Sequence, residues 1–113
     1  MEMLEEKIGD VKVLHLRGRL DLAVSREFED RVKALIGAGE NRFILDCRDL
    51  KYVSSSGIGA FVACGKQLSA SGKLVFAALT PHVASVFEMT GLTRVFTVFK
   101  SKEDALQQLG AAG

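Results

Sequence analysis

The chain has almost no proline and no long apolar run. Pro81 is the only proline among its 113 residues, which suits a compact protein without a hinge segment. The longest apolar runs, IGAFVACG and LVFAAL, are far too short to cross a bilayer as a helix. The first residues, MEMLEEK, lack the positive and apolar regions of a secretory signal. We therefore expect a single domain over residues 1–113, located in the cytoplasm and without membrane insertion.

The sequence also lacks an excess of one charge and any metal-binding pattern. Its 15 basic and 14 acidic side chains leave a net charge of +1, which gives no attraction toward nucleic acid or an anionic membrane. The two cysteines, Cys47 and Cys64, form neither a CxxC pair nor a cluster with histidine. We expect Cys47 in a loop, Cys64 in the packed face of a helix, and no disulfide, metal site or cofactor.

What is present is a 48% apolar content in alternating strand and helix patterns. Two N-terminal strands are joined by Gly9-Asp10, a two-residue turn typical of hairpins. Short apolar runs predict three further strands, because buried parallel strands have continuous apolar sequences. The strands are expected at 3–8, 11–17, 42–46, 73–79 and 94–99.

Apolar stripes at helical spacing predict helices between these strands. The first helix starts at Leu22 and ends at Gly37 or Gly39. The second begins within residues 54–56 and ends at Gly72. The first stripe contains Val24, Phe28, Val32, Leu35 and Ile36, and the second contains Ile58, Phe61, Val62, Gly65 and Leu68.

Two later helices have clear end signals. Thr80 caps the third, with Pro81 at its first position, and Gly91 ends it. Ser101 and Asp104 form the cap of a fourth helix. The resulting order, β-β-α-β-α-β-α-β-α, predicts an α/β fold whose mixed sheet is mostly parallel, with an N-terminal antiparallel hairpin strand and about four helices.

The stretch YVSSSGIG is expected at the binding edge of this sheet. In open sheets of this kind, sites lie beyond the carboxyl ends of the parallel strands, where the loops 18–25, 46–56 and 79–81 meet. Serines at a helix start face its partial positive charge, and glycines leave the backbone open to another molecule. Such a stretch can bind a phosphate ligand or carry a phosphate on a serine. Serine caps and turn glycines also occur for structural reasons alone.

Enzymatic motifs fit this stretch poorly. GAFVACGKQ lacks the spacing and the hydroxyl of a Walker loop, Ser55 lacks the first glycine of a hydrolase elbow, and a dinucleotide fingerprint is incomplete. Asp46, Thr80 and Lys100 each end a predicted parallel strand, which resembles response-regulator receiver domains. Those domains also need an acidic pair for magnesium, and the corresponding loop offers only Asp21.

Four stretches, in the right order, resemble the STAS domain family, which includes bacterial anti-sigma factor antagonists. YVSSSGIG resembles the signature D-S-[ST]-G-[LI]-G, and LRGRLDLAVSREFEDRV resembles the L-x-G-x-[LI]-D segment and first helix. FILDCRDLKYV and VFEMTGLTRVFTVFKSKEDAL are similar to the family's third strand and C-terminal third. The resemblance implies a STAS-like fold and a protein-binding function without enzymatic activity.

The resemblance also implies a phosphorylation switch in transcription regulation. In such antagonists the residue before the first glycine of the signature, Ser56 here, is phosphorylated by a partner that is both a serine kinase and an anti-sigma factor. The unphosphorylated protein binds this partner and frees the sigma factor. Phosphorylation releases the partner, and a PP2C-type phosphatase restores the first state. The partner-binding surface implied by the resemblance comprises Asp21, Ser54, Ser55, Gly57, Ile58 and Gly59.

The chain departs from the signature at Ser54, where the family has an aspartate. This change removes a carboxylate beside the acceptor and leaves three adjacent serines, so Ser55 and Ser54 are alternatives to Ser56. It also favours a second interpretation, a STAS scaffold or adaptor in a larger complex without a phosphorylation cycle. A phosphate- or nucleotide-binding enzyme is the third, and the sequence supplies no obvious base or metal set for it.

Overall fold

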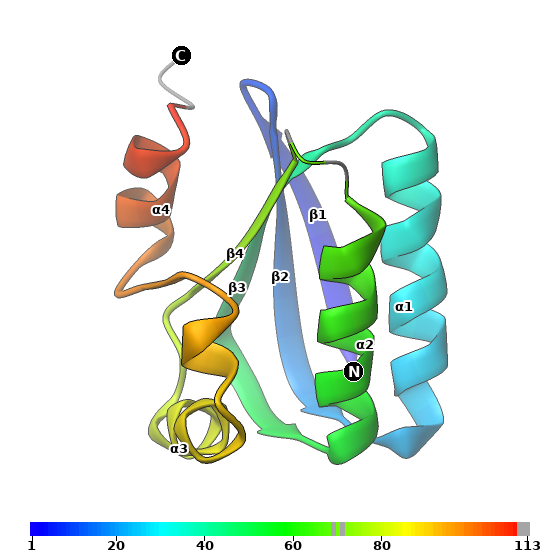
Figure 1. The fold of residues 1–113 in the computed structure, drawn as a ribbon, viewed down its shortest axis with the longest axis vertical. Helices are drawn as coiled ribbons and strands as arrows, with labels where there is room; N and C mark the ends of the chain where they lie inside the picture. Colours follow the sequence, from blue (N-terminus) through cyan, green and yellow to red (C-terminus); the bar gives the residue numbers. More distant parts are fainter. Residues whose placement is uncertain (69, 71, 111–113) are drawn as a thin grey trace.

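A five-stranded sheet forms the centre of the computed structural model, which describes residues 1–68, 70 and 72–110. The strands lie in the order β1-β2-β3-β4-β5 (Figure 1). β1 pairs with β2 antiparallel, and each later pair of neighbours is parallel. The predicted α/β class with an antiparallel N-terminal hairpin is therefore confirmed. The strands are β1 (Glu2–Ile8), β2 (Val11–Leu20), β3 (Arg42–Val53), β4 (Lys73–Ala77) and β5 (Val98–Phe99).

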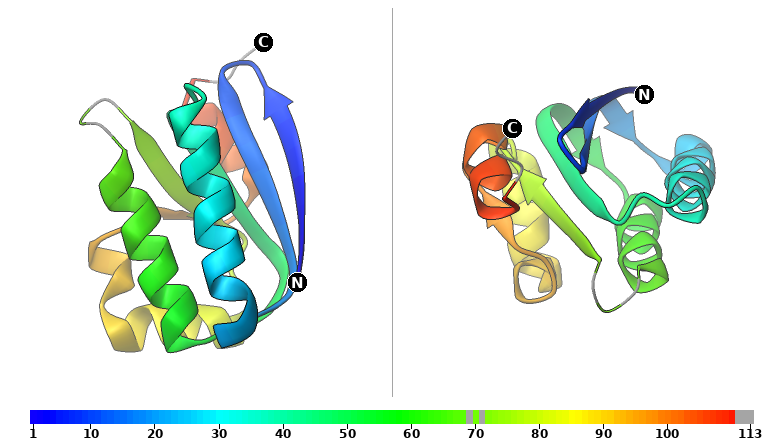
Figure 2. Two further views of the ribbon diagram at one scale, coloured as in Figure 1. Left: turned by 90° about the vertical axis from the view of Figure 1, so that its right-hand side faces the viewer. Right: turned by 90° about the horizontal axis from the view of Figure 1, so that it is seen from above.

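Helices cover both faces of this sheet. α1 (Leu22–Gly37), α2 (Ser55–Gln67) and α3 (Pro81–Thr90) pack on one face, and α4 (Lys102–Gln108) packs on the other (Figures 1 and 2). Phe61 of α2 lies in the larger core, edge to face with Phe28 and Phe76, at ring-centroid distances of 5.6 and 4.9 Å. The smaller core, on the α4 face, contains Val11, Val13, Ile44, Val75, Ala77, Ala105 and Leu109.

Both predicted helix stripes pack against the larger core, although not every member is fully buried. Phe28 and Val32 are buried in α1, as expected. In α2, Phe61 is buried, whereas Ile58 and Val62 are partly buried and pack against the core. The buried positions of α2 are Gly57, Ala60, Phe61 and Cys64. α2 ends at Gln67, before the predicted stop at Gly72, and residues 69 and 71 lie outside the described residues.

β3 is longer than predicted. The predicted end of this strand at Asp46 and the predicted loop position of Cys47 are both wrong, because the strand continues to Val53 and Cys47 is buried within it. The misleading feature is the adjacent charged pair Arg48 and Asp49, both exposed. A register shift against β2 adds one residue to β3 at this place. Such a bulge lets two consecutive side chains face solvent before the alternation resumes.

The last strand is shorter than the predicted 94–99. Gly91, with φ 77°, ends α3 as expected, but a 3-10 turn, η1 (Leu92–Arg94), follows it. The N–H of Phe96 then donates to the carbonyl of Leu92 at 2.8 Å. The β-branched and aromatic residues of RVFTVF favour a strand. The turn hydrogen bonds occupy the first part of this segment, so only Val98 and Phe99 pair with β4. The predicted Ser101 cap of α4 is confirmed by a 3.1 Å bond from the N–H of Asp104.

Candidate functional site

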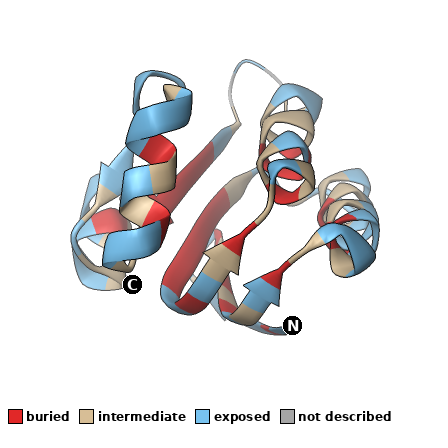
Figure 3. Ribbon diagram, turned by 90° about the horizontal axis from the view of Figure 1, so that it is seen from below, coloured by how far each residue is buried: buried red, intermediate tan, exposed pale blue. Residues whose placement is uncertain are grey.

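β2 and β3 end side by side, and each leads directly into a helix. Leu20 at the end of β2 and Val53 at the end of β3 are register partners. The N–H of Ser54 donates a 2.9 Å hydrogen bond to the carbonyl of Leu20. Figure 3, seen from this end, shows both helices starting from the same edge of the sheet. The predicted meeting of the segments 18–25 and 46–56 is therefore confirmed.

Asp21 and Ser54 cap the two helices. A carboxylate oxygen of Asp21 accepts the N–H of Val24 at 3.3 Å, and the hydroxyl of Ser54 accepts the N–H of Gly57 at 3.1 Å. The first turn of a helix leaves its N–H groups without an intrahelical acceptor, and each cap satisfies one of them. Both side chains therefore have a structural role at the site.

Ser55 and Ser56 come after the cap, as the first two residues of α2. Ser55 is exposed and Ser56 is partly exposed. They lie at the positive end of the helix dipole, where a negative group is stabilised by about 0.3–1 kcal/mol. A chemical change at either hydroxyl would leave the cap bond of Ser54 in place.

The two glycines of the stretch differ in their surroundings. A Cβ atom on Gly57 would lie 2.8 Å from Cγ2 of Val53 and 2.9 Å from Cδ2 of Leu20, so this buried glycine is required by the chain's own packing. From the sequence alone, the bare backbone at Gly57 suggests the approach of another molecule, whereas the structure shows that Leu20 and Val53 fill the space beside it. The space beside Gly59 is open, because this glycine is exposed and a Cβ there would have no described atom within 4 Å.

An exposed leucine that the sequence analysis did not single out lies beside this stretch. Leu22 follows the capping Asp21 at the start of α1 and is 75% exposed. Its place outside the buried stripe of α1, directly after a cap, is the sequence feature that could have identified it. Leu22 therefore adds an exposed apolar side chain at the start of the helix that contacts α2.

A basic and aromatic cluster borders the site at the end of β3. The guanidinium carbon of Arg19 lies 4.3 Å from the ring centroid of Tyr52. The ring of His82, at the start of α3, stacks with Tyr52 at 6.1 Å and 13°. Thr80 precedes α3 as predicted, but its side chain makes no cap hydrogen bond to the helix; its hydroxyl instead donates to the carbonyl of Leu50 at 3.0 Å. The third predicted segment, 79–81, therefore also meets this edge of the sheet.

The structure contradicts the receiver-like arrangement of Asp46, Thr80 and Lys100. Asp46 does not end a strand, and its carboxylate lies 2.9 Å from Nδ1 of His15. Lys100 lines a cleft together with Asp46 on the α4 side of the sheet, whereas Thr80 bonds to β3 further along, at Leu50. The hydroxyl of Thr80 is therefore directed to Leu50, and not to the carboxylate of Asp46 beside which a receiver domain would need it.

Neither thiol is suited to nucleophilic chemistry. Burial raises the pKa of Cys47 far above its usual range and raises the pKa of Cys64 to about 12, so both stay protonated at neutral pH. In residues 1–68, 70 and 72–110, no group of three His, Cys, Asp or Glu side chains is arranged to hold a metal ion. In the same residues, no helix has both the length and the apolar character that crossing a membrane requires.

Comparison with known proteins identifies relatives along nearly the whole chain. A family model described as STAS domain matches residues 3–105. BtrV of Bordetella bronchiseptica, which is named as a candidate anti-sigma factor antagonist, is 35% identical over 106 residues. The match covers 93% of this chain and 91% of BtrV.

Solved structures show the same fold at lower identity. A candidate anti-sigma factor antagonist from Thermotoga maritima has a TM-score of 0.89 at 21% identity, covering 94% of this chain and 92% of its own. The anti-sigma factor antagonist SpoIIAA in its unphosphorylated form has a TM-score of 0.85 at 22% identity, covering 99% of both chains. Bacillus SpoIIAA in the phosphorylated form has a TM-score of 0.75 at 22% identity, covering 96% of this chain and 99% of its own.

Proposed function

The chain belongs to the STAS domain family, and we propose that it is an anti-sigma factor antagonist switched by phosphorylation of Ser56. The observation that carries the proposal is the position of Ser56 in the first turn of α2, partly exposed and directly after the cap made by Ser54. A hydroxyl at this place can accept a phosphoryl group without being needed to start the helix. The protein then acts in the cytoplasm by binding, and not as an enzyme.

The fold is suited to carry the phosphate. A phosphoserine adds about −1.5 to −2 charges at pH 7. At residue 56 this charge would lie among the first N–H groups of α2, which stabilise anions. The likeness of this chain to SpoIIAA in both its unphosphorylated and its phosphorylated form supports a fold that is kept in the two states.

The phosphate that the fold tolerates would weaken the binding of the partner. We expect an anti-sigma factor with serine kinase activity to pack against the starts of α1 and α2, where Leu22, Ser55 and Gly59 are exposed. A phosphate inside that interface would be buried without a counter-charge, which is costly. The carboxylate of Asp21 beside it would add repulsion. Phosphorylation therefore releases the partner, and a PP2C-type phosphatase returns the protein to its binding state.

Ser54 keeps the structural role of the aspartate that it replaces in the STAS signature. Its hydroxyl accepts the N–H of Gly57, which is the bond that an aspartate makes at an N-cap. What the chain lacks is the charge of that aspartate. The acceptor hydroxyl therefore has one carboxylate neighbour fewer, and the capped helix start is retained.

The test compares two single-serine variants. The wild type, Ser56→Ala and Ser55→Ala are incubated with ATP and the host's cytosolic extract, and the added mass is mapped to a peptide. We expect one phosphoryl group on the wild type and on the control Ser55→Ala, and none on Ser56→Ala. Ser56→Ala should still retain the partner in co-precipitation. Incorporation at the wild-type level in Ser56→Ala would exclude Ser56 as the acceptor.

The scaffold interpretation is favoured by one observation, the missing aspartate at Ser54. A scaffold would keep its partner after incubation with ATP and would gain no mass, in an extract that phosphorylates a known substrate. A phosphorylation switch would gain the mass of a phosphoryl group and would release its partner. One experiment therefore distinguishes the two functions.

A further inference from the structure

β4 is only partly covered by the strand beside it. It pairs with β3 along its whole length, whereas β5 pairs only with Phe76 and Ala77. The segment before β5 is turned away from β4, because the N–H of Phe96 donates to the carbonyl of Leu92. Within the part of the chain that the structure describes, no strand therefore stands beside residues 73–75 on the side away from β3.

The backbone of Leu74 points to this uncovered side. The N–H of Lys73 donates at 2.8 Å to the carbonyl of Asn41, toward β3, and the N–H of Phe76 donates at 3.0 Å to the carbonyl of Thr97, toward β5. Successive residues of a strand direct their backbone groups to opposite neighbours. Leu74 therefore shares the side of Phe76, and it offers one N–H and one C=O to an added strand.

A groove of about 250 Å³ lies beside this backbone, between the start of β4, the end of α2 and the segment before β5. Val95, on its rim, is 65% exposed. The groove is at the opposite end of α2 from Ser56, so it is separate from the proposed phosphorylation site. Its apolar lining comes from Leu68, Leu74, Val75, Val95 and Phe96.

The charge at this edge has one sign. Lys73 lines the groove, and Arg94 lines an adjoining groove that shares Val95 and Phe96 with the first. Among the described residues, no carboxylate lines either groove, and neither cation forms an ion pair. The edge is therefore complementary to a segment that carries acidic side chains.

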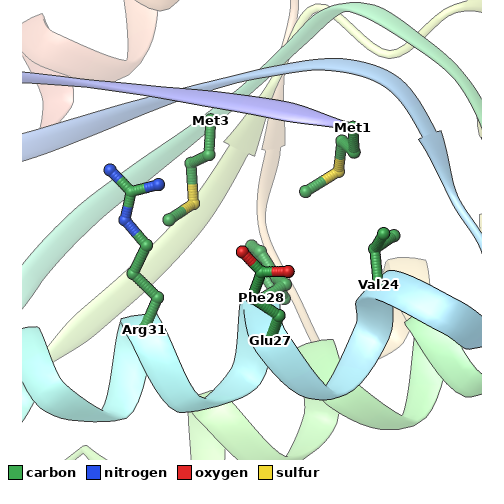
Figure 4. A pocket seen from close by; sticks show the side chains of 6 residues that line it. All are labelled: Met1, Met3, Val24, Glu27, Phe28 and Arg31. Atoms are coloured by element: carbon green, nitrogen blue, oxygen red, sulfur yellow. The ribbon is translucent and has the colours of Figure 1, made fainter.

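The opposite edge of the sheet, β1, differs because charged side chains protect it. Figure 4 shows Glu27 and Arg31 of α1 directed toward this strand, beside Met1 and Met3. Charges along an edge strand discourage pairing with other chains. The uncovered Leu74 has no such protection. The charged and exposed residues of β1 are Glu2, Glu5, Glu6 and Lys7.

We propose that the open edge of β4 binds an extended segment of another protein, with apolar residues between acidic ones. The segment adds a strand whose main chain bonds to the N–H and C=O of Leu74, and an apolar side chain enters the groove. Its acidic side chains face Lys73 and Arg94. A second copy of this chain fits poorly, because pairing through the same edge brings two positively charged grooves together. The proposal does not depend on the phosphorylation of Ser56.

Amide hydrogen exchange in the full chain tests whether the edge is open. Val75 is the internal reference, because its N–H lies on the β3 side of the same strand. After correction for intrinsic rates, the amide of Leu74 should exchange about tenfold faster than that of Val75. Equal protection of the two amides would show a covered edge and would overturn the proposal.

A synthetic peptide tests the recognition. The probe has alternating valine and threonine between glutamates at both blocked ends, and a second peptide carries lysines at those ends. In NMR titrations of the full chain, the acidic peptide should shift the amide of Leu74 and slow its exchange, and the basic peptide should not. No shift at Leu74 up to about 2 mM acidic peptide would refute the proposal.

Charge exchange tests the role of the lysine. Lys73→Glu should weaken the acidic peptide about tenfold and should bind the basic one better than the wild type does. The matched control Lys51→Glu changes an exposed lysine of β3 and should leave both affinities unchanged. Unchanged affinity in Lys73→Glu would overturn the proposal. Self-association of the chain that the acidic peptide competes away would assign the edge to a second copy and would overturn it as well.

Discussion

Gly57 and Gly59 lie two residues apart in α2, and we expect substitution by alanine to destabilise the fold at the first and to stabilise it at the second. Gly57→Ala places a methyl group 2.8 Å from Val53 and 2.9 Å from Leu20, both buried and unable to move cheaply. Overpacking of this kind costs about 1–3 kcal/mol. Gly59→Ala meets no described atom within 4 Å, so only the better helix propensity of alanine remains, which stabilises by about 0.5–1 kcal/mol.

The comparison isolates the packing cost. Both variants gain similar helix propensity, so the difference between their free energies of unfolding is the overpacking at Gly57, about 1–3 kcal/mol. Urea unfolding followed by circular dichroism measures it, provided that the m-values agree. Equal stabilisation of the two variants would refute the packing argument for Gly57. Gly59→Ala should in addition weaken partner binding although it stabilises the fold, because its methyl group lies on the proposed interface.

Two further predictions concern the cap and the thiols. Ser54→Ala should lose about 1 kcal/mol of unfolding free energy in the same urea assay, and Ser54→Asp, which can make the same cap bond, should lose none; equal losses would mean that the bond to Gly57 contributes nothing. Cys47 and Cys64 should resist a thiol reagent at about pH 8 in the folded protein and react once urea unfolds it, since burial raises the pKa of both thiols; rapid labelling of the folded protein would contradict their burial.

The sequence was informative at several places where one short segment determines its own structure. The stripe of α1, the Gly9-Asp10 turn, the Gly91 stop and the Ser101 cap depend on neighbours within a few residues, and the structure has all four. The position of the serines at the sheet edge also followed, because the alternation of strands and helices fixes which ends of the strands carry loops.

Two of the errors, at β3 and at Gly57, arose where distant residues decide the outcome. The second half of β3 is a strand because β2 extends alongside it, and its exposed charges conceal this in the sequence. The space around Gly57 is filled by Leu20, which is far from it in sequence, so a packing requirement was interpreted as an opening for another molecule. The side chain of His15 on β2 likewise contacts Glu6 on β1 and Asp46 on β3, and no local sequence pattern predicts these contacts.

The extra length of β3 has a consequence for solubility. Pairing between β3 and β4 ends at Asp46 and Ala77, while β2 and β3 continue together to Leu20 and Val53. The site therefore lies at the end of a two-stranded extension of the sheet. Beyond Asp46, the edge of β3 that faces away from β2 has no neighbouring strand among the described residues, and such an edge can pair with strands of other molecules. The start of α3 lies along that edge, fastened through Thr80 to the carbonyl of Leu50. The same helix that borders the proposed binding surface therefore covers a strand edge on which other chains could otherwise pair.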